Sequence, residues 1–382
     1  MIRLCEPTFT QADRDRIETV LTTGQMIQGR YVAEFEALAA DWLGCDIIAC
    51  SSGTAALHLA LLALDLQPGD EVLVPAFTWP STAHVIVQAG LVPVFVDVDA
   101  DTLCVTADAM RRAVGPRTRA ILPVHLFGAT APMRALLELA ASHQLRVVED
   151  AACSIGSRVD TGDWSGTVGD IGCFSLHPRK TITTGEGGLL ATRDATLAAR
   201  LRLLRNHGME RTEQGIVFTA PGLNYRLGEL SGALGVGQMQ QLDHILQQRR
   251  ILAETYIALL SELPVHVPSG IRDPRTAVQS FVIDLAPAAG DHPSLGPWRQ
   301  NLMASLREAG VETTIGTYCV TDQPVYEHRA LPSPQAFPAS RHLARALMTL
   351  PLHHRMNTDD VRAVVSALKE TLASIASLDS LS

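Results

Sequence analysis

The sequence predicts an α/β fold, in which helices alternate with the strands of a mostly parallel sheet, followed by a smaller second domain. From residue 46 onward, short apolar runs alternate with helical patterns, which is the rhythm of βαβ units. Beyond about Leu242 this rhythm gives way to a long helical pattern, a proline-rich stretch and the strand-like QSFVIDL. The chain has 382 residues, of which 47% are hydrophobic, so it can bury a large core.

The predicted elements follow in chain order. A lead-in helix is expected over residues 10–24, because Thr10 suits an N-cap and Gly24 suits the position after a helix end. A second helix over roughly residues 31–43 precedes the strand-like DIIACSSG and the buried helical pattern TAALHLALLALDL. The strand patterns EVLVPAF, VPVFVDV, RAILPVH and RVVEDA then alternate with helical patterns, and the strand signals DIGCFSLH and GGLLATR come after them.

The change of pattern places a domain boundary near residue 245. The predicted large domain covers residues 1–244, and the predicted small domain covers residues 245–382. Within the small domain, residues 286–296 are rich in Pro, Gly and Ser and are expected to form an exposed loop.

Composition argues against several classes of partner. The formal net charge is −9 and no run of Lys or Arg could follow a phosphate backbone or an anionic bilayer, so neither nucleic acid nor a membrane is expected. No apolar stretch reaches about 18 residues, and the first residues lack the order of a signal peptide, so we expect a cytoplasmic protein. The seven widely spaced cysteines include no C-x-x-C pair, which favours reduced thiols and no metal site.

Lysine is rare in this chain. Lys180 and Lys369 are the only lysines among its 31 Lys and Arg residues. Lys369 lies in VVSALKETL, an amphipathic helical pattern in which a surface lysine is ordinary. Lys180 instead lies between a predicted strand and the glycine-rich TTGEGG, where small residues let a ligand approach the backbone closely.

A nucleophilic role is one of two interpretations of Lys180. A lysine that attacks a carbonyl must lose its proton, and burial and cationic neighbours such as His177 and Arg179 favour that loss. The alternative is a loop lysine that forms an ion pair with Glu186.

Three further segments offer candidate ligand contacts. The segment CSSGTAAL places backbone N–H groups and the hydroxyls of Ser52 and Thr54 at a predicted helix N-terminus, where a phosphate is stabilised. Asp150 ends a predicted parallel strand at the sheet edge where α/β proteins bind ligands, and it suits an N-cap equally well. Trp79 in PAFTWPST is either a core aromatic or a flat surface for a planar ligand.

Together these features describe a pyridoxal phosphate site, with a phosphate cradle, an aromatic plate, a carboxylate for a ring nitrogen and a lysine for an aldehyde. The sequence resembles the DegT/DnrJ/EryC1/StrS family of sugar aminotransferases, which have fold type I. The resemblance runs through GQMIQGRYVAEFE, SSGTAAL, PAFTWPSTAHVIVQAGLVPVFVDVD, VHLFG, VVEDAA, FSLHPRKTITTGEGG, GLNYRLGELSGALGVGQMQQLD and LPLHHRM. It therefore covers almost the whole chain.

The resemblance implies a large domain with a mainly parallel sheet flanked by helices, a smaller C-terminal α+β domain, and pyridoxal 5′-phosphate as the cofactor. It implies two catalytic residues, Lys180, which binds the cofactor aldehyde covalently, and Asp150, which pairs with the ring nitrogen. The other implied cofactor-binding residues are Trp79 at the ring, and Gly53, Thr54, Ala55 and Ser175 at the phosphate. Asn224, in GLNYR, matches a residue that reaches the phosphate bound by the other chain of a homodimer, and its alternative is a loop-capping side chain.

Two positions depart from the family pattern. Cys153 stands where the family usually has a Gln that hydrogen-bonds the phenolic oxygen of the cofactor, and a thiol is a weaker partner than an amide. Cys153 is still expected to contact the cofactor. Thr321, in TYCVTDQPVY, stands where the family commonly shows a His. Both changes can alter the geometry of the substrate.

The activity that the resemblance implies is transamination by a pyridoxal phosphate-dependent enzyme. The expected substrates are L-glutamate and a keto sugar, most suitably a nucleotide-linked keto-deoxyhexose, in a homodimer with shared active sites. One alternative keeps the cofactor but acts on a non-nucleotide ketone, or carries out a non-transamination reaction of secondary metabolism. Another is a non-catalytic sensor of the cofactor or of a nucleotide sugar.

Overall fold

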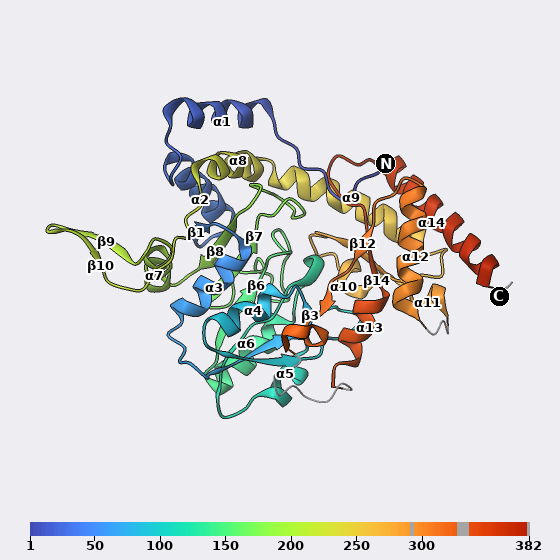
Figure 1. Ribbon diagram of the computed structural model, residues 1–382, viewed down its shortest axis with the longest axis horizontal. Helices are drawn as coiled ribbons and strands as arrows, with labels where there is room; N and C mark the ends of the chain where they lie inside the picture. The colour runs from blue at the N-terminus through green and yellow to red at the C-terminus, as the bar shows by residue number, and fades with distance from the viewer. Residues whose placement is uncertain (291–293, 327–335, 380–382) are drawn as a thin grey trace.

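The computed structural model describes residues 1–290, 294–326 and 336–379. Its larger part is a seven-stranded sheet covered by helices (Figure 1). The strands, in their order across the sheet, are β1 (Asp46–Cys50), β8 (Gly188–Thr192), β7 (Ile171–Ser175), β6 (Arg146–Asp150), β5 (Thr118–Ile121), β2 (Glu71–Pro75) and β4 (Val92–Val96). Within this sheet β8 alone runs against its neighbours, so the prediction of a mainly parallel sheet is confirmed.

Helices alternate with these strands along the chain, as predicted. They are α1 (Gln11–Thr23), α2 (Arg30–Leu43), α3 (Gly53–Ala63), α4 (Ser81–Gln88), α5 (Ala107–Ala113), α6 (Met133–His143), α7 (Ala195–Arg205) and α8 (Glu229–Gln240). The first helix lies between the two predicted end residues. Thr10 accepts a hydrogen bond from the N–H of Asp13 at its start, and Gly24, at φ 69°, follows its end.

The sheet is buried on both faces, and β1 shows why. Its side chains point alternately to opposite faces. Ile47 and Ala49 belong to the apolar cluster that α2 and α8 complete, whereas Ile48 and Cys50 belong to the cluster that includes α3. A strand that is apolar at successive positions therefore stabilises helices on both sides.

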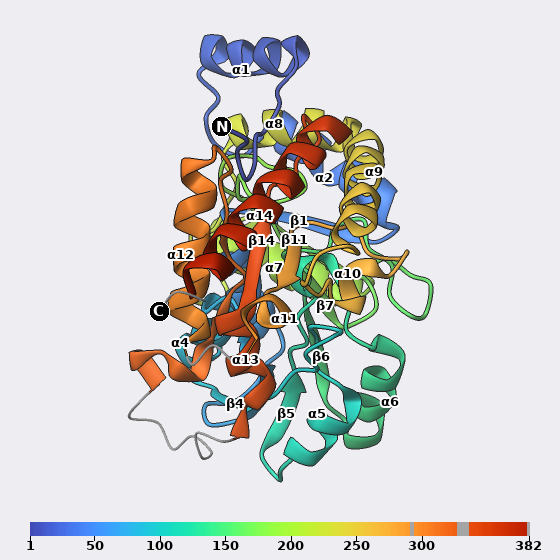
Figure 2. The ribbon, with the colours of Figure 1, turned by 90° about the vertical axis from the view of Figure 1, so that its right-hand side faces the viewer.

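The smaller part is a three-stranded antiparallel sheet with helices packed against it (Figure 2). Its strands are β11 (Phe281–Asp284), β14 (Leu347–Leu350) and β12 (Thr314–Ile315). Its helices are α9 (Leu242–Leu260), α10 (Ser269–Arg272), α11 (Ala286–Ala289), α12 (Leu295–Glu308), α13 (Pro338–Ala346) and α14 (Thr358–Asp379), with 3-10 turns η2 (Val320–Asp322) and η3 (Pro324–Tyr326). The strand expected in QSFVIDL and the long helix after residue 242 are thus present.

Strand pairing and backbone hydrogen bonds join the two parts, in addition to the covalent chain. Strand β13 (Tyr318–Cys319) pairs with β3 (Phe77–Thr78) of the larger part. The 3-10 turn η1 (Leu126–Gly128) is held by the N–H groups of Gln279 and Ser280, which both donate to the carbonyl of Phe127. The N-terminal residues lie on the smaller part, where Ile2 pairs with Val311. The space between the parts is therefore fixed by several contacts.

Two predictions about domain organisation can be compared with the structure. The prediction of an exposed loop over 286–296 is wrong, because α11 occupies its start and α12 begins at Leu295. Pro287 lies in the first turn of α11, where a proline removes no helical hydrogen bond. Residues 291–293 lie outside the described residues. The boundary near residue 245 falls within α9, and the division into 1–244 and 245–382 stays a prediction.

A two-stranded hairpin extends away from the body of the molecule (Figure 1). It consists of β9 (Met209–Thr212) and β10 (Gly215–Phe218), and its apolar residues Ile216 and Phe218 are exposed. Across the described residues, no helix combines the length and the apolar character needed to cross a bilayer.

Candidate active site

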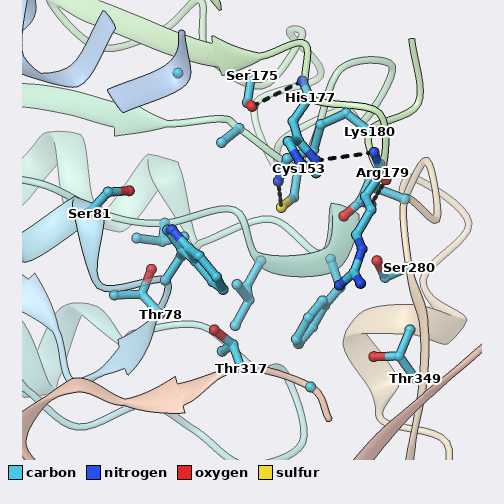
Figure 3. A pocket seen from close by; sticks show the side chains of 18 of the residues that line it. Thr78, Ser81, Cys153, Ser175, His177, Arg179, Lys180, Ser280, Thr317 and Thr349 are labelled. Carbon is cyan, nitrogen blue, oxygen red and sulfur yellow. Dashed lines mark hydrogen bonds between the residues drawn. The ribbon is translucent and has the colours of Figure 1, made fainter. Parts of the chain in front are cut away.

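A cavity of about 770 Å³ opens at the carboxyl ends of β6 and β7 (Figure 3). Asp150 and Ser175 are the last residues of these neighbouring strands, and both line the cavity. The N-terminus of α3 lies beside them, and β12 and β14 of the smaller part also contribute lining residues. This is the edge at which open α/β sheets bind ligands.

Lys180 enters the cavity from the turn that follows β7. Its backbone N–H donates to the carbonyl of His177, and its Nζ donates to Sγ of Cys153 over 3.0 Å. The amine is thus directed at Cys153 rather than at Glu186, which was the alternative partner (Figure 3). Desolvation holds the pKa of His177 below its usual range, so His177 supplies no positive charge beside Lys180 at neutral pH.

Asp150 is 4% exposed and lies on the floor of the cavity. One carboxylate oxygen accepts a hydrogen bond from the hydroxyl of Thr82 (2.8 Å), and the other accepts the N–H of Ala152 (3.1 Å). No helix starts after Asp150, so it is not an N-cap. Burial raises the pKa of this carboxyl, although the Thr82 hydrogen bond and the charge of Lys180 act against the rise.

The start of α3 forms a cradle with unused donors. Ser52 is the N-cap, and its hydroxyl accepts the N–H of Ala55 over 3.0 Å. The N–H groups of Gly53 and Thr54 point out of the helix end and have no acceptor among the described residues. Gly53 is needed here because a Cβ at this position would lie 2.8 Å from Cβ of Ser175.

Trp79 lies on the wall of the cavity and is 61% exposed, so it is not a core aromatic. Its ring meets that of Tyr318 edge-on, with centroids 5.7 Å apart. Because Tyr318 comes from β13, the pairing of β13 with β3 places both rings at the mouth of the site.

Two supporting groups were not singled out from the sequence. Thr82, in the first turn of α4, bonds Asp150 and also the hydroxyl of Thr78 at 3.0 Å. Next to Asp150 in the chain, Glu149 is fully buried and bonds Nε2 of the equally buried His125 at 2.9 Å. The two adjacent acidic residues in EDAA and the histidine in VHLFG could have suggested the contact between Glu149 and His125. Nothing in the sequence indicated Thr82.

Glu149 ties the loop after β6 to the sheet. Its carboxylate accepts the N–H groups of Gly166, Val168 and Gly169, in addition to the His125 contact. Burial alone would raise the pKa of Glu149, but these hydrogen bonds, led by that of His125, hold it below its usual range. The carboxylate therefore stays charged in the core.

Three predicted positions lie outside the cavity lining. The N–H of Ala55 is already used by Ser52. Asn224 is exposed and pairs through its backbone with Asn206, near the hairpin of β9 and β10. Thr321 is buried in η2, where its hydroxyl contacts Sγ of Cys319 at 3.2 Å. All the other predicted site residues meet in one cavity.

The groups in the cavity fit pyridoxal phosphate. The unused N–H groups of Gly53 and Thr54 suit a phosphate at a helix N-terminus. Asp150 is a buried carboxylate with no salt bridge among the described residues, which suits a protonated ring nitrogen. Lys180 presents the amine that the cofactor aldehyde requires.

Comparison with known proteins agrees with this geometry. Residues 7–369 match the DegT/DnrJ/EryC1/StrS aminotransferase family. The chain is 34% identical over 379 residues to GDP-perosamine synthase of Caulobacter vibrioides, a match that covers 97% of this chain and 98% of that protein. Among solved structures it resembles the aminotransferase TlmJ of Streptoalloteichus hindustanus, with 30% identity, a TM-score of 0.88, and coverage of 98% and 100%.

The fold is shared more widely than the sequence. Helicobacter pylori PseC, an aminotransferase involved in the biosynthesis of pseudoaminic acid, has a TM-score of 0.90 at 23% identity, with 98% of this chain and 99% of PseC covered. The match of sequence and that of structure both extend over nearly the whole chain. The chain therefore belongs to the DegT/DnrJ/EryC1/StrS aminotransferase family and is a pyridoxal phosphate-dependent transaminase of fold type I.

Proposed function

We propose that this enzyme transfers an amino group from L-glutamate to a keto sugar linked to a nucleotide, most suitably a keto-deoxyhexose. The observation that carries the proposal is that the Lys180 amine and the Asp150 carboxylate share one cavity. Its volume of about 770 Å³ lies high in the range of roughly 300–1,000 Å³ typical of ligand cavities, which suits a large substrate. The likeness to GDP-perosamine synthase supports a nucleotide-linked sugar.

The proposal assigns the cofactor contacts as follows. Gly53, Thr54 and Ser175 hold the phosphate, Trp79 lies against the ring, Asp150 pairs with the ring nitrogen, and Cys153 lies near the phenolic oxygen. Ala55 supports the cradle through its bond to Ser52 rather than by touching the phosphate. Thr82 keeps the Asp150 carboxylate in place.

The chemistry then depends on where protons are held. Bound pyridoxal phosphate withdraws electrons from the carbon that carries the amino group, which makes the proton on that carbon acidic. Nζ of Lys180 takes this proton from L-glutamate, and in the second half of the reaction Nζ gives a proton to the carbon of the sugar. Asp150, by its negative charge, holds a proton at the ring nitrogen.

The proposal includes a homodimer with shared sites. Asn224 is exposed in the single chain, so its side chain is available to another chain. Ile216 and Phe218 on the nearby hairpin are exposed apolar residues, which mark a surface suited to protein contact. In the dimer, Asn224 would donate to the phosphate held by the other chain.

We also assign the enzyme to the cytoplasm. All seven cysteines are free thiols, which suits a reducing compartment. Neither nucleic acid nor a membrane is part of the proposal, since the net charge is −9.

The proposal is tested with purified enzyme loaded with cofactor. L-glutamate is supplied with a panel of 3-keto and 4-keto nucleotide sugars and with the same keto sugars without a nucleotide, and the release of 2-oxoglutarate is followed. We expect release above background with at least one nucleotide sugar, and none from the Lys180→Ala variant. Turnover only with ketones that lack a nucleotide would overturn the proposed acceptor, and absence of any reaction with L-glutamate would overturn the proposed donor.

A further inference from the structure

Arg179 is a cation in the cavity that the proposed chemistry leaves unused. It is the one arginine among the lining residues, and its guanidinium makes no hydrogen bond or ion pair with the described residues. Arginine keeps its charge at all relevant pH values. A permanent charge that faces a cavity without a partner is suited to an anionic ligand.

The backbone of Arg179 is held in place from both sides. Nε2 of Gln279 donates to the Arg179 carbonyl over 2.6 Å, and the Arg179 N–H donates to Nδ1 of His177 over 3.3 Å. Gln279 is 6% exposed, and its own carbonyl accepts a hydrogen bond from the buried Arg249. The base of the Arg179 side chain is therefore anchored to the smaller part of the molecule.

Figure 3 shows the direction of the Arg179 side chain. The Lys180 amine turns toward Cys153, whereas the Arg179 side chain runs in the direction of Ser280 and Thr349. Thr349 already donates its hydroxyl to the carbonyl of Ile315, but the hydroxyl of Ser280 has no partner among the described residues. In this view the Arg179 guanidinium and the Ser280 hydroxyl lie on the same side of the cavity, away from the Lys180 amine.

No acidic side chain among the described lining residues forms an ion pair with the Arg179 guanidinium. Among the described lining residues the acidic ones are Asp150, which accepts hydrogen bonds from Thr82 and Ala152, and the exposed Glu186, which forms no ion pair with the described residues. The lining residues that the structure describes in the smaller part, from Gln279 onward, are uncharged. The positive charge of Arg179 is therefore left for a substrate.

We propose that Arg179, with Ser280, binds the distal carboxylate of the amino donor and so selects a dicarboxylic amino acid. This inference rests on the proposed function, in which L-glutamate is the donor. With the α-carbon of the donor at Nζ of Lys180, its side chain would reach toward Arg179 and Ser280, which line the same cavity. An arginine can bind a carboxylate through two parallel hydrogen bonds, which a neutral amide does not reproduce.

Binding of an unreactive dicarboxylate tests this inference without catalysis. Glutarate and its monoamide differ only in one charged end, and their affinities for the cofactor-loaded enzyme are measured by titration calorimetry. We expect the Arg179→Gln variant to bind glutarate roughly 10- to 100-fold more weakly, the range for a hydrogen bond to a charged group, with the monoamide unchanged. Arg179→Lys should recover part of the loss, and Ser280→Ala should show a smaller loss.

Arg307→Gln is the matched control, because Arg307 is an exposed arginine of α12 that lies outside the cavity. It removes the same charge and should leave both affinities unchanged. In parallel, the loss of visible cofactor absorbance is measured with L-glutamate and with L-glutamine. The half-saturating concentration should rise for L-glutamate only.

Three results would overturn the inference. These are equal weakening of glutarate and its monoamide, unchanged binding of glutarate, or an equal rise of the half-saturating concentration for L-glutamate and L-glutamine. Failure of the proposed function is separate, because it appears in the wild-type enzyme as absence of 2-oxoglutarate release.

Discussion

The side-chain nitrogen of Lys180 lies 3.0 Å from the sulfur of Cys153, although 27 positions separate the two residues in the sequence. The strands β6 and β7 are parallel neighbours, so the segments after their carboxyl ends meet at one edge of the sheet. Under the proposed attachment to Lys180, the cofactor would lie next to Cys153.

Cofactor loading should protect Cys153 from alkylation. In the enzyme without cofactor, Cys153 is partly exposed and should react with iodoacetamide, whereas in the loaded enzyme the reaction should slow at least tenfold. The measurement is peptide mass spectrometry over time. Cys45 is the control, since it lies outside the cavity and burial raises its pKa to about 11, so it should react slowly and equally in both forms. Equal rates at Cys153 in the two forms would contradict the assigned position of the cofactor.

Lys180→Arg should abolish turnover and leave the fold intact. A guanidinium keeps its proton at neutral pH, so it can neither bond an aldehyde covalently nor accept a proton from a substrate. Thermal unfolding and the reaction with L-glutamate alone are measured. Lys369→Arg, the change at the other lysine, should behave as the wild type. Borohydride reduction of the wild type should leave the cofactor on Lys180, and an adduct on Lys369 would refute the assignment.

Asp150→Asn should retain the cofactor but slow the reaction with L-glutamate by about 100- to 1,000-fold, because a neutral amide no longer favours a protonated ring nitrogen. Cofactor binding is followed by absorbance and the reaction by stopped-flow. Thr82→Val, which removes the hydroxyl bonded to Asp150, should give a smaller loss of about tenfold, as expected for one hydrogen bond. Parallel loss of binding and rate in Asp150→Asn would indicate a structural role instead.

Asn224 can be tested by mixing two inactive variants. If it serves the site of the other chain, Lys180→Ala and Asn224→Asp should complement each other, because one site of each mixed dimer then holds both wild-type residues. Co-expression should restore up to about half of the wild-type rate per mixed dimer, given independent sites. Full activity of Asn224→Asp alone, or an inactive mixture in which mixed dimers are shown to form, would exclude the shared contact.

Glu149→Gln should destabilise the protein in a pH-dependent way. The folded-state pKa of Glu149 lies below its usual value, so its carboxylate stabilises the native state above that value, and the stabilisation is lost as pH falls through the folded-state pKa. We expect a loss of about 3 kcal/mol in the free energy of unfolding at pH 7, as for a broken buried pair. Urea unfolding at several pH values measures it, and the difference from the wild type should begin to shrink only below about pH 4.5, the usual pKa of a Glu carboxyl, and disappear below the folded-state pKa.

Glu138→Gln provides the control for this pH series. Glu138 is exposed on α6, and its substitution should change the free energy of unfolding by less than about 0.5 kcal/mol at any pH. A loss in Glu149→Gln that stays constant with pH would show that the effect comes from packing and not from charge.

Much of the fold could be predicted because periodicity and end residues report on each element by itself. Thr10 and Gly24 mark the ends of α1, and the apolar run over 47–50 predicts a strand. The prediction of a loop over 286–296 is wrong because a proline in the first turn of a helix is compatible with both a loop and a helix.

The sequence by itself determined which residues can do the chemistry. Lysine is so rare in this chain that Lys180 stands out, and Asp150 ends a strand at the edge where ligands bind. Whether Trp79 packs in the core or lines a cavity, and whether Lys180 meets Glu186 or Cys153, was decided only by the tertiary structure. The order of strands brings distant segments together, as it does for Thr82 and Asp150, and a local pattern records only the burial and the ends of its own element.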